Sequence, residues 1–167
     1  MWLDDLSLGG AMKSIIVFRH AAPDDAGDGI SDRYGVPQAD RLGQQIRHAV
    51  QFSSCAIFTS PVLRAKQTAA RVALAIGRPV PVRDVVCLVH DNARHQSEII
   101  SLVDEAWKEY DTVILSTHHP LTSTITRLFF GGIYGGRWPS SRARDLQAFM
   151  YAEGLHFAEN FFIRFRP

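Results

Sequence analysis

An arginine and a histidine stand side by side at the end of an apolar run near the start of the chain. Residues 15–18 are Ile, Ile, Val and Phe, and Arg19 and His20 follow them directly. Such a run indicates a strand buried on both faces of a mostly parallel sheet, where binding groups gather at strand ends. There an imidazole could attack phosphorus, and a guanidinium could hold phosphoryl oxygens with two hydrogen bonds. The pair is compatible with a phosphate site and equally with two solvated residues after a strand.

A second segment, residues 57–69, runs from a strand pattern through Ser60 and Pro61 into a helical pattern. Serine is favoured at helix N-caps and proline at the first helical position, so we expect the helix to begin at Pro61. Arg64 then lies near the N-terminal end of that helix, which attracts anions. Together with the first segment, it favours a phosphate site over an ordinary solvated arginine.

A third segment, residues 113–120, is another apolar strand pattern that ends in His118, His119 and Pro120. Successive strand side chains point to opposite faces, so adjacent histidines do not readily bind one metal ion. The chain also contains neither His-Glu-x-x-His nor paired Cys-x-x-Cys spacings. We therefore expect no catalytic metal and no cofactor.

In this order, the three segments resemble the signature of the histidine phosphatase superfamily, the phosphoglycerate mutase-like enzymes. That signature is Arg-His-Gly, then Ser-Pro-x-x-Arg-Ala-x-Gln-Thr, then a strand that ends in a second histidine. The resemblance covers roughly residues 13–135, and its three parts are jointly specific. The chain departs from the signature at Ala21, where the family has glycine.

The resemblance implies that His20 becomes phosphorylated while Arg19, Arg64 and His118 surround the phosphoryl oxygens. Water then hydrolyses the phosphohistidine, and no metal is needed. The Thr-His-His-Pro sequence looks most like the short bacterial phosphohistidine phosphatases, which makes His118 the catalytic partner and His119 its neighbour.

The proton donor for the leaving group is a separate question. In much of the family it is an acidic residue after the third strand, and we predict Asp91 for this role. Asp24, Asp25 and Glu98 are the alternatives. When the leaving group is a histidine imidazole, as in a phosphohistidine protein, the need for a strong acid is different. A weak signal for the proton donor therefore does not count against such a substrate.

The chain has little room for the long insertions that close over the ligand in larger family members. A short, open site favours a phosphohistidine on a protein, followed by a small phosphomonoester. A third hypothesis is a non-catalytic module that holds phosphate or a partner, and the intact site residues argue against it. Residues that could line the mouth of the site are His90, His95, Tyr134, Arg137 and Trp138.

Composition excludes some classes of partner. The net charge of +1 gives no reason to expect nucleic acid or an anionic membrane surface. No apolar run approaches the roughly 18 residues of a membrane span, and residues 1–5 are acidic where a signal peptide is basic. We therefore expect a cytoplasmic protein in which Cys55 and Cys87 are free, buried thiols within strands.

Strand and helix patterns alternate along the chain, which predicts an α/β three-layer sandwich with a central, mostly parallel sheet flanked by helices. The 167 residues fit one domain at 12–167, with residues 1–11 as a possible N-terminal arm. The expected strands lie near 14–18, 55–59, 82–86, 112–117 and 161–166, and the expected helices near 37–51, 61–76, 94–109 and 120–130.

Overall fold

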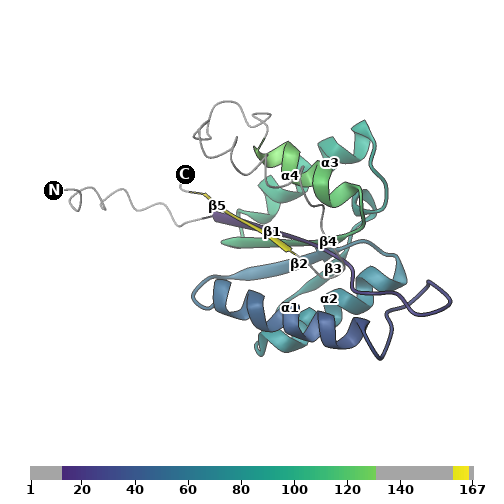
Figure 1. The fold of residues 1–167 in the computed structure, drawn as a ribbon. Coiled ribbons are helices and arrows are strands. Elements are labelled where there is room, and N and C mark those ends of the chain that lie inside the picture. The colour runs from purple at the N-terminus through teal and green to yellow at the C-terminus, as the bar shows by residue number, and fades with distance from the viewer. Residues whose placement is uncertain (1–12, 131–159, 166–167) are drawn as a thin grey trace.

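The computed structural model describes residues 13–130 and 160–165, which form a five-stranded sheet covered by helices (Figure 1). The strands are β1 (Lys13–Arg19), β2 (Cys55–Thr59), β3 (Val82–Asp84), β4 (Thr112–Thr117) and β5 (Asn160–Phe165). Their order across the sheet is β3-β2-β4-β1-β5. The first four are parallel to one another, and β5 runs antiparallel to β1.

Helices lie on both faces of the sheet, α1 and α2 on one side and α3 and α4 on the other (Figure 1). Their bounds are α1 (Gly35–Ala49), α2 (Leu63–Ile76), α3 (Ala93–Ala106) and α4 (Leu121–Phe130), with a short 3-10 helix η1 (Val86–Leu88) before α3. The predicted three-layer sandwich with a mostly parallel sheet is confirmed. Within the described ranges, no helix is long and apolar enough to cross a membrane.

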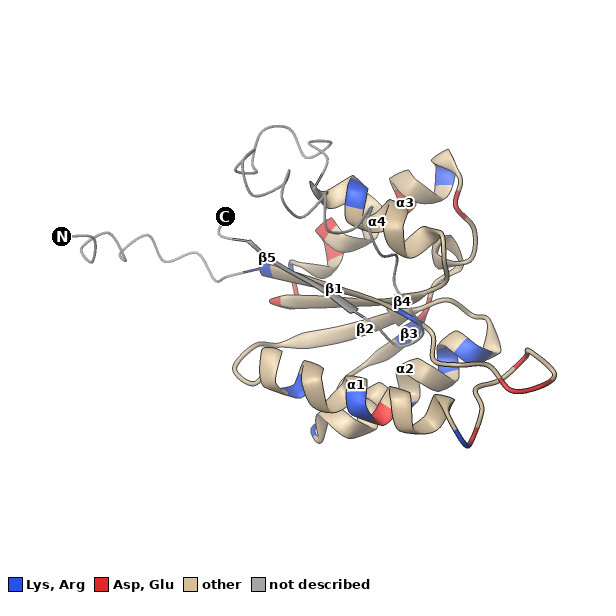
Figure 2. Ribbon diagram, in the orientation of Figure 1, with Lys and Arg blue, Asp and Glu red and all other residues tan. Residues whose placement is uncertain are grey.

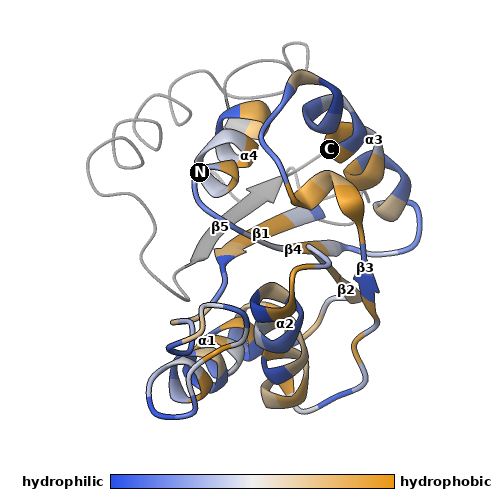
Figure 3. Cartoon of the chain, turned by 90° about the vertical axis from the view of Figure 1, so that its right-hand side faces the viewer, coloured by the Kyte–Doolittle hydropathy of each residue, from blue (hydrophilic) through white to orange (hydrophobic). Residues whose placement is uncertain are grey.

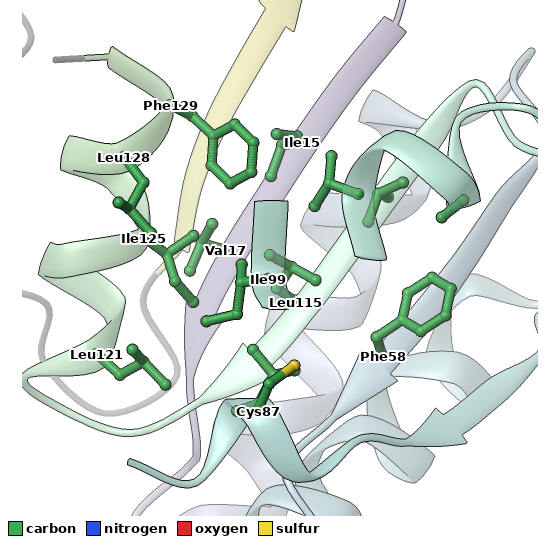
Figure 4. Packing of buried hydrophobic residues seen from close by; sticks show 14 of the residues in the cluster. Ile15, Val17, Phe58, Cys87, Ile99, Leu115, Leu121, Ile125, Leu128 and Phe129 are labelled. Atoms are coloured by element: carbon green, nitrogen blue, oxygen red, sulfur yellow. The ribbon is translucent and has the colours of Figure 1, made fainter. Parts of the chain in front are cut away.

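The apolar side chains of β1 contribute to two separate hydrophobic cores, because they alternate between the two faces of the sheet. Ile16 and Phe18 pack in the cluster with α1 and α2. Ile15 and Val17 pack in the cluster with α3 and α4, which Figure 4 shows. All four side chains have 0% relative exposure. A strand covered on both faces therefore accounts for the continuous apolar pattern.

Helices α1 and α2 approach each other closely at Gly43. A Cβ atom there would lie 2.5 Å from the Cβ of Ala75 and 2.8 Å from the carbonyl oxygen of Val72. Any larger residue would push the helices apart. This close packing fixes the position of α2, which carries Arg64.

The strand expected near 82–86 is shorter than predicted. It ends at Asp84, and all three of its residues are exposed at the edge of the sheet. The chain then turns into η1, which is apolar where β3 is hydrophilic (Figure 3). Cys87 therefore lies in a 3-10 turn and not in a strand, while both cysteines are free and buried as predicted.

Charged residues are distributed over both helical layers, as Figure 2 shows for Lys and Arg. This distribution agrees with the small net charge of +1. The possible arm at residues 1–11 lies outside the described residues, as do Tyr134, Arg137 and Trp138.

Candidate active site

The predicted site residues lie at or beyond the carboxyl ends of three neighbouring parallel strands. In the register of the sheet, Arg19 of β1 pairs with Thr117 of β4, and Thr59 of β2 pairs with Ser116. Backbone pairing continues one residue further, because the amide of His20 donates to the carbonyl of Thr117 at 3.0 Å. The sheet therefore fixes the backbone from which the predicted site residues project.

The two nitrogens of the His20 ring have different partners. Nδ1 lies 2.8 Å from the carbonyl oxygen of Ala21, which can only accept, so Nδ1 carries the proton. Nε2 accepts a hydrogen bond from Nε of Arg64 at 3.2 Å, so its lone pair faces that guanidinium. This is the tautomer that a histidine nucleophile acting through Nε2 requires.

Burial holds His20 in its neutral form. The residue is only 5% exposed, and this desolvation is the main cause that lowers its pKa from 6.5 to about 4. The positive charges of Arg64 and Arg19 act in the same direction, while the hydrogen bond to Ala21 opposes them. The ring is therefore uncharged and retains a lone pair at neutral pH.

Arg64 is the second residue of α2, and its side chain reaches across the site. Besides the contact with His20, its Nη1 donates to the carbonyl of Gly27 at 2.9 Å. Arg19 is close enough to Arg64 that their repulsion contributes, after burial, to a lowered pKa of Arg19. Two neighbouring guanidiniums favour the binding of an anion such as phosphate between them.

The predicted N-cap at Ser60 is wrong. Helix α2 begins at Leu63, its N-cap is Val62, and no side chain caps it. Ser60 still continues the pairing of β2 with β4 at the carboxyl end of these strands, because its amide donates to the carbonyl of Ser116 at 2.9 Å. Its hydroxyl oxygen lies 2.9 Å from Nε2 of His118. The serine thus contacts a predicted site residue, and Pro61 precedes the helix.

His118 lies directly opposite His20, with 5.1 Å between the ring centroids. Its pKa is also lowered to about 4, first by burial and then by electrostatic interaction with its neighbours, among which His20 contributes most. Nδ1 of His118 is buried and has no hydrogen-bond partner among the described residues. The adjacent His119 is exposed.

Three of the four carboxylates considered as proton donors have hydrogen-bond or ion-pair partners in the surrounding loops and helices. Asp91 accepts from the side-chain Nε2 of Gln96 at 3.0 Å and from the hydroxyl of Thr124 at 2.6 Å, which links it to α3 and α4. Glu98 forms an ion pair with Arg94 on the surface of α3.

Asp24 closes its own loop, with its two oxygens accepting from the amides of Asp28 and Gly29 at 3.2 and 3.1 Å. Asp25 is exposed. Two of the expected mouth residues lie beside each other, since the rings of His90 and His95 are stacked 6.2 Å apart. His90 is near enough to His118 to contribute to its lowered pKa.

Two residues of the second motif hold the loop that follows His20, a role that the sequence analysis missed. The side-chain oxygen of Gln67 accepts from the amide of Ile30 at 2.8 Å, and the hydroxyl of Thr68 accepts from the amide of Ala21 at 2.9 Å. Arg64, Gln67 and Thr68 are three and four positions apart, so they share one helix face. This spacing is a sequence signal for a polar face directed at one target.

A comparison with models of protein families adds an independent observation. Residues 15–86 match the model of the histidine phosphatase superfamily, branch 1. The match covers less than half of the chain and shows that this segment is similar to that superfamily. The matched segment holds Arg19, His20 and Arg64, and the fold brings His118 to them from beyond it.

Known structures share the fold of this chain. A candidate phosphohistidine phosphatase named SixA from Agrobacterium tumefaciens is 16% identical, with 93% of this chain and 98% of that chain covered and a TM-score of 0.63. The protein histidine phosphatase SixA in complex with tungstate is 21% identical over 68% of this chain and 74% of that chain, with a TM-score of 0.55.

A mycobacterial glucosyl-3-phosphoglycerate phosphatase in complex with VO3 is also similar. It is 13% identical over 90% of each chain, with a TM-score of 0.61. At these identities the likeness concerns the fold. No sequence among curated proteins matches this chain.

Proposed function

We propose that this protein is a phosphatase that forms a covalent phosphohistidine on His20. The observation that carries the proposal is the state of that ring: neutral, with the proton of Nδ1 held by Ala21 and the lone pair of Nε2 beside Arg64. A nucleophile must present such a lone pair, and the charges needed to bind a phosphoryl group are adjacent.

In the first step, Nε2 of His20 attacks phosphorus in line with the leaving group, whose bond to phosphorus breaks. Before this attack, Arg64 must transfer its Nε hydrogen bond from Nε2 of His20 to a phosphoryl oxygen, which frees the lone pair. Arg19 and His118 bind the other oxygens and stabilise the charge that spreads over them in the transition state. In the second step, water attacks the phosphohistidine, inorganic phosphate leaves, and His20 returns to its neutral form.

The substrate class that we favour is a phosphohistidine on a protein. The likeness in fold to two proteins named SixA supports this choice, and so do the exposed residues at the site entrance, such as His90 and Asp91. A small phosphomonoester is the second candidate, supported by the likeness to a glucosyl-3-phosphoglycerate phosphatase. We expect the protein to act in the cytoplasm.

Asp91 is the proton donor that we propose for an oxygen leaving group. If so, Asp91→Asn slows hydrolysis of an alkyl phosphate by about tenfold or more, with a smaller effect on p-nitrophenyl phosphate, whose leaving group needs little protonation. Equal rates for wild type and variant with the alkyl phosphate would reassign the role to Asp24, Asp25 or Glu98.

Phosphate release from two substrates tests the proposed function. Wild-type protein is incubated in EDTA with p-nitrophenyl phosphate or with a phosphorylated histidine-containing phosphocarrier protein, and His20→Ala serves as the control. We expect release from both, with kcat/KM at least about a hundredfold higher for the phosphocarrier because its remote contacts add binding energy. A higher kcat/KM for small esters would favour the second candidate.

Binding of tungstate without release from either substrate would instead indicate the non-catalytic module. The EDTA arm tests metal independence in the same assay. Activity that requires added magnesium or zinc would contradict the mechanism, because Arg19 and Arg64 are proposed to supply the positive charge.

A further inference from the structure

The backbone of Ala21 is held on both sides by side chains from two helices. Its amide donates to the hydroxyl of Thr68 on α2 at 2.9 Å, and the next amide, that of Ala22, donates to Oε1 of Gln38 on α1 at 2.8 Å. Between these two amides lies the Ala21 carbonyl, which accepts from Nδ1 of His20 at 2.8 Å. Ala21 itself is fully buried.

Gln38 acts on the same peptide unit that contacts His20. The carbonyl of Ala21 and the amide of Ala22 belong to one planar group, so a hydrogen bond at the N–H fixes the direction of the C=O. Hydrogen bonds at both ends of a peptide unit also polarise one another, which makes the carbonyl a stronger acceptor.

Thr68 joins the backbones on either side of the site. While its hydroxyl oxygen accepts from Ala21, its proton is donated to the carbonyl of Arg64 at 2.7 Å. The side chain is fully buried, so no water competes for either hydrogen bond. Thr68 therefore sets the distance between the backbones of Arg64 and Ala21.

We propose that Gln38 and Thr68 are positioning residues that hold the Ala21 peptide groups, so that His20 keeps its proton on Nδ1 and its lone pair on Nε2. This inference rests on the proposed function, in which Nε2 attacks phosphorus. If the Ala21 carbonyl turned away, Nδ1 would lose its acceptor, and the proton could move to Nε2. That nitrogen would then have no lone pair for the attack and no acceptor to offer Arg64.

Nitrogen-15 spectra of the histidine rings test this inference without substrate, because a ring nitrogen that carries a proton resonates far from one with a lone pair. The variants are Gln38→Leu and Thr68→Val, each of which removes the polar group with little change in volume. We expect the His20 signals to shift from the Nδ1–H pattern towards the Nε2–H pattern. We also expect kcat to fall on the order of tenfold to a hundredfold, with a smaller change in KM.

Each variant has a matched control. Thr126 on α4 is also fully buried and also donates to the carbonyl four residues earlier, at 2.8 Å, so Thr126→Val reproduces the loss of a helix hydrogen bond. Gln45 is an exposed glutamine on the same helix as Gln38, so Gln45→Leu controls for the substitution itself. Both controls should keep the wild-type His20 spectrum and kcat. Thr68→Ser, which keeps the hydroxyl group, should also show the wild-type spectrum and kcat.

The inference is overturned if both test variants keep the Nδ1–H pattern and the wild-type kcat. Should Thr68→Val fail to fold, Gln38→Leu decides alone, since Gln38 is only half-buried. The outcome is separate from that of the proposed function. An inactive wild type whose tautomer still depends on Gln38 would refute the phosphatase and support the positioning.

Discussion

The surroundings of His20 and His118 are alike in electrostatics and different in hydrogen bonding. Both residues follow the ends of adjacent parallel strands, and burial lowers the pKa of each to about 4. In His20, a carbonyl accepts from one ring nitrogen and a guanidinium donates to the other, so only one tautomer satisfies both partners. In His118, the partner of Nε2 is the hydroxyl of Ser60, which can donate or accept.

This difference separates the roles of two otherwise similar imidazoles. The lone pair of His20 is directed by fixed backbone and arginine contacts, as a nucleophile requires. His118 has a buried Nδ1 with no partner in the described part of the chain, so it retains hydrogen-bonding capacity for a phosphoryl oxygen. In the proposed mechanism, attack on phosphorus needs a neutral ring, and the contacts of the two ring nitrogens favour His20 over His118 as the attacking residue.

The largest effect is expected from removing the directed lone pair. His20→Ala should lower kcat with p-nitrophenyl phosphate by at least about a thousandfold, because no other group forms the covalent intermediate. Circular dichroism should show that the fold is retained. If His20→Ala kept a substantial fraction of the wild-type kcat, His20 would not be the nucleophile, and the proposed difference in role between His20 and His118 would be wrong.

Arg64→Ala removes the guanidinium that faces the His20 lone pair. We expect a loss of about 2 to 4 kcal/mol in transition-state stabilisation, measured from kcat/KM, together with weaker inhibition by vanadate. Arg41→Ala is the matched control, because Arg41 is an exposed arginine on α1. Similar losses in both variants would show that Arg64 acts through general charge and not through its position.

The role of His118 is tested by comparing it with His119, its neighbour after β4. His118→Ala should lower kcat/KM by about a hundredfold, as expected for a group that donates to the phosphoryl oxygens. His119→Ala should change it about twofold or less, because that side chain is exposed. A larger effect at His119 than at His118 would invert the assignment.

Acid should destabilise the protein through both rings. Each has a pKa near 4 in the fold, below the ordinary value of 6.5, so in this interval the unfolded chain binds more protons than the folded one. The free energy of unfolding, measured with urea, should therefore decrease as the pH falls from 6.5 towards 4. Above pH 6.5 the two rings should contribute almost no pH dependence. A His20→Ala variant should lose part of this pH dependence, and an unchanged dependence would contradict the lowered pKa of His20.

The sequence predicted the sheet and both helical layers, because these depend on local patterns, and it predicted that the candidate site residues lie together at strand ends. A continuous apolar run such as residues 15–18 is typical of a strand with two covered faces, and parallel strands bring their ends to one edge. The contacts of Ser60 could not be derived in this way. Its local pattern favours an N-cap, but its backbone pairs with β4 just beyond the carboxyl end of β2.

The contacts that hold the His20 loop were also beyond local patterns. Gln38 is one half-buried glutamine in a helix, and its hydrogen bond to Ala22 depends on how α1 packs against the site. The spacing of Arg64, Gln67 and Thr68 did contain usable information, since it places three polar side chains on one helix face. Which backbone groups they bind becomes apparent only in the fold.

Direct trapping of the intermediate tests the central claim, that His20 is the nucleophile. Wild-type protein is mixed with phosphorus-32-labelled substrate, quenched rapidly in base and digested, and the labelled peptide is identified by mass spectrometry. We predict an acid-labile, base-stable phosphate on His20, and no label in His20→Ala. Label on His118, on a serine or on an aspartate would contradict the account.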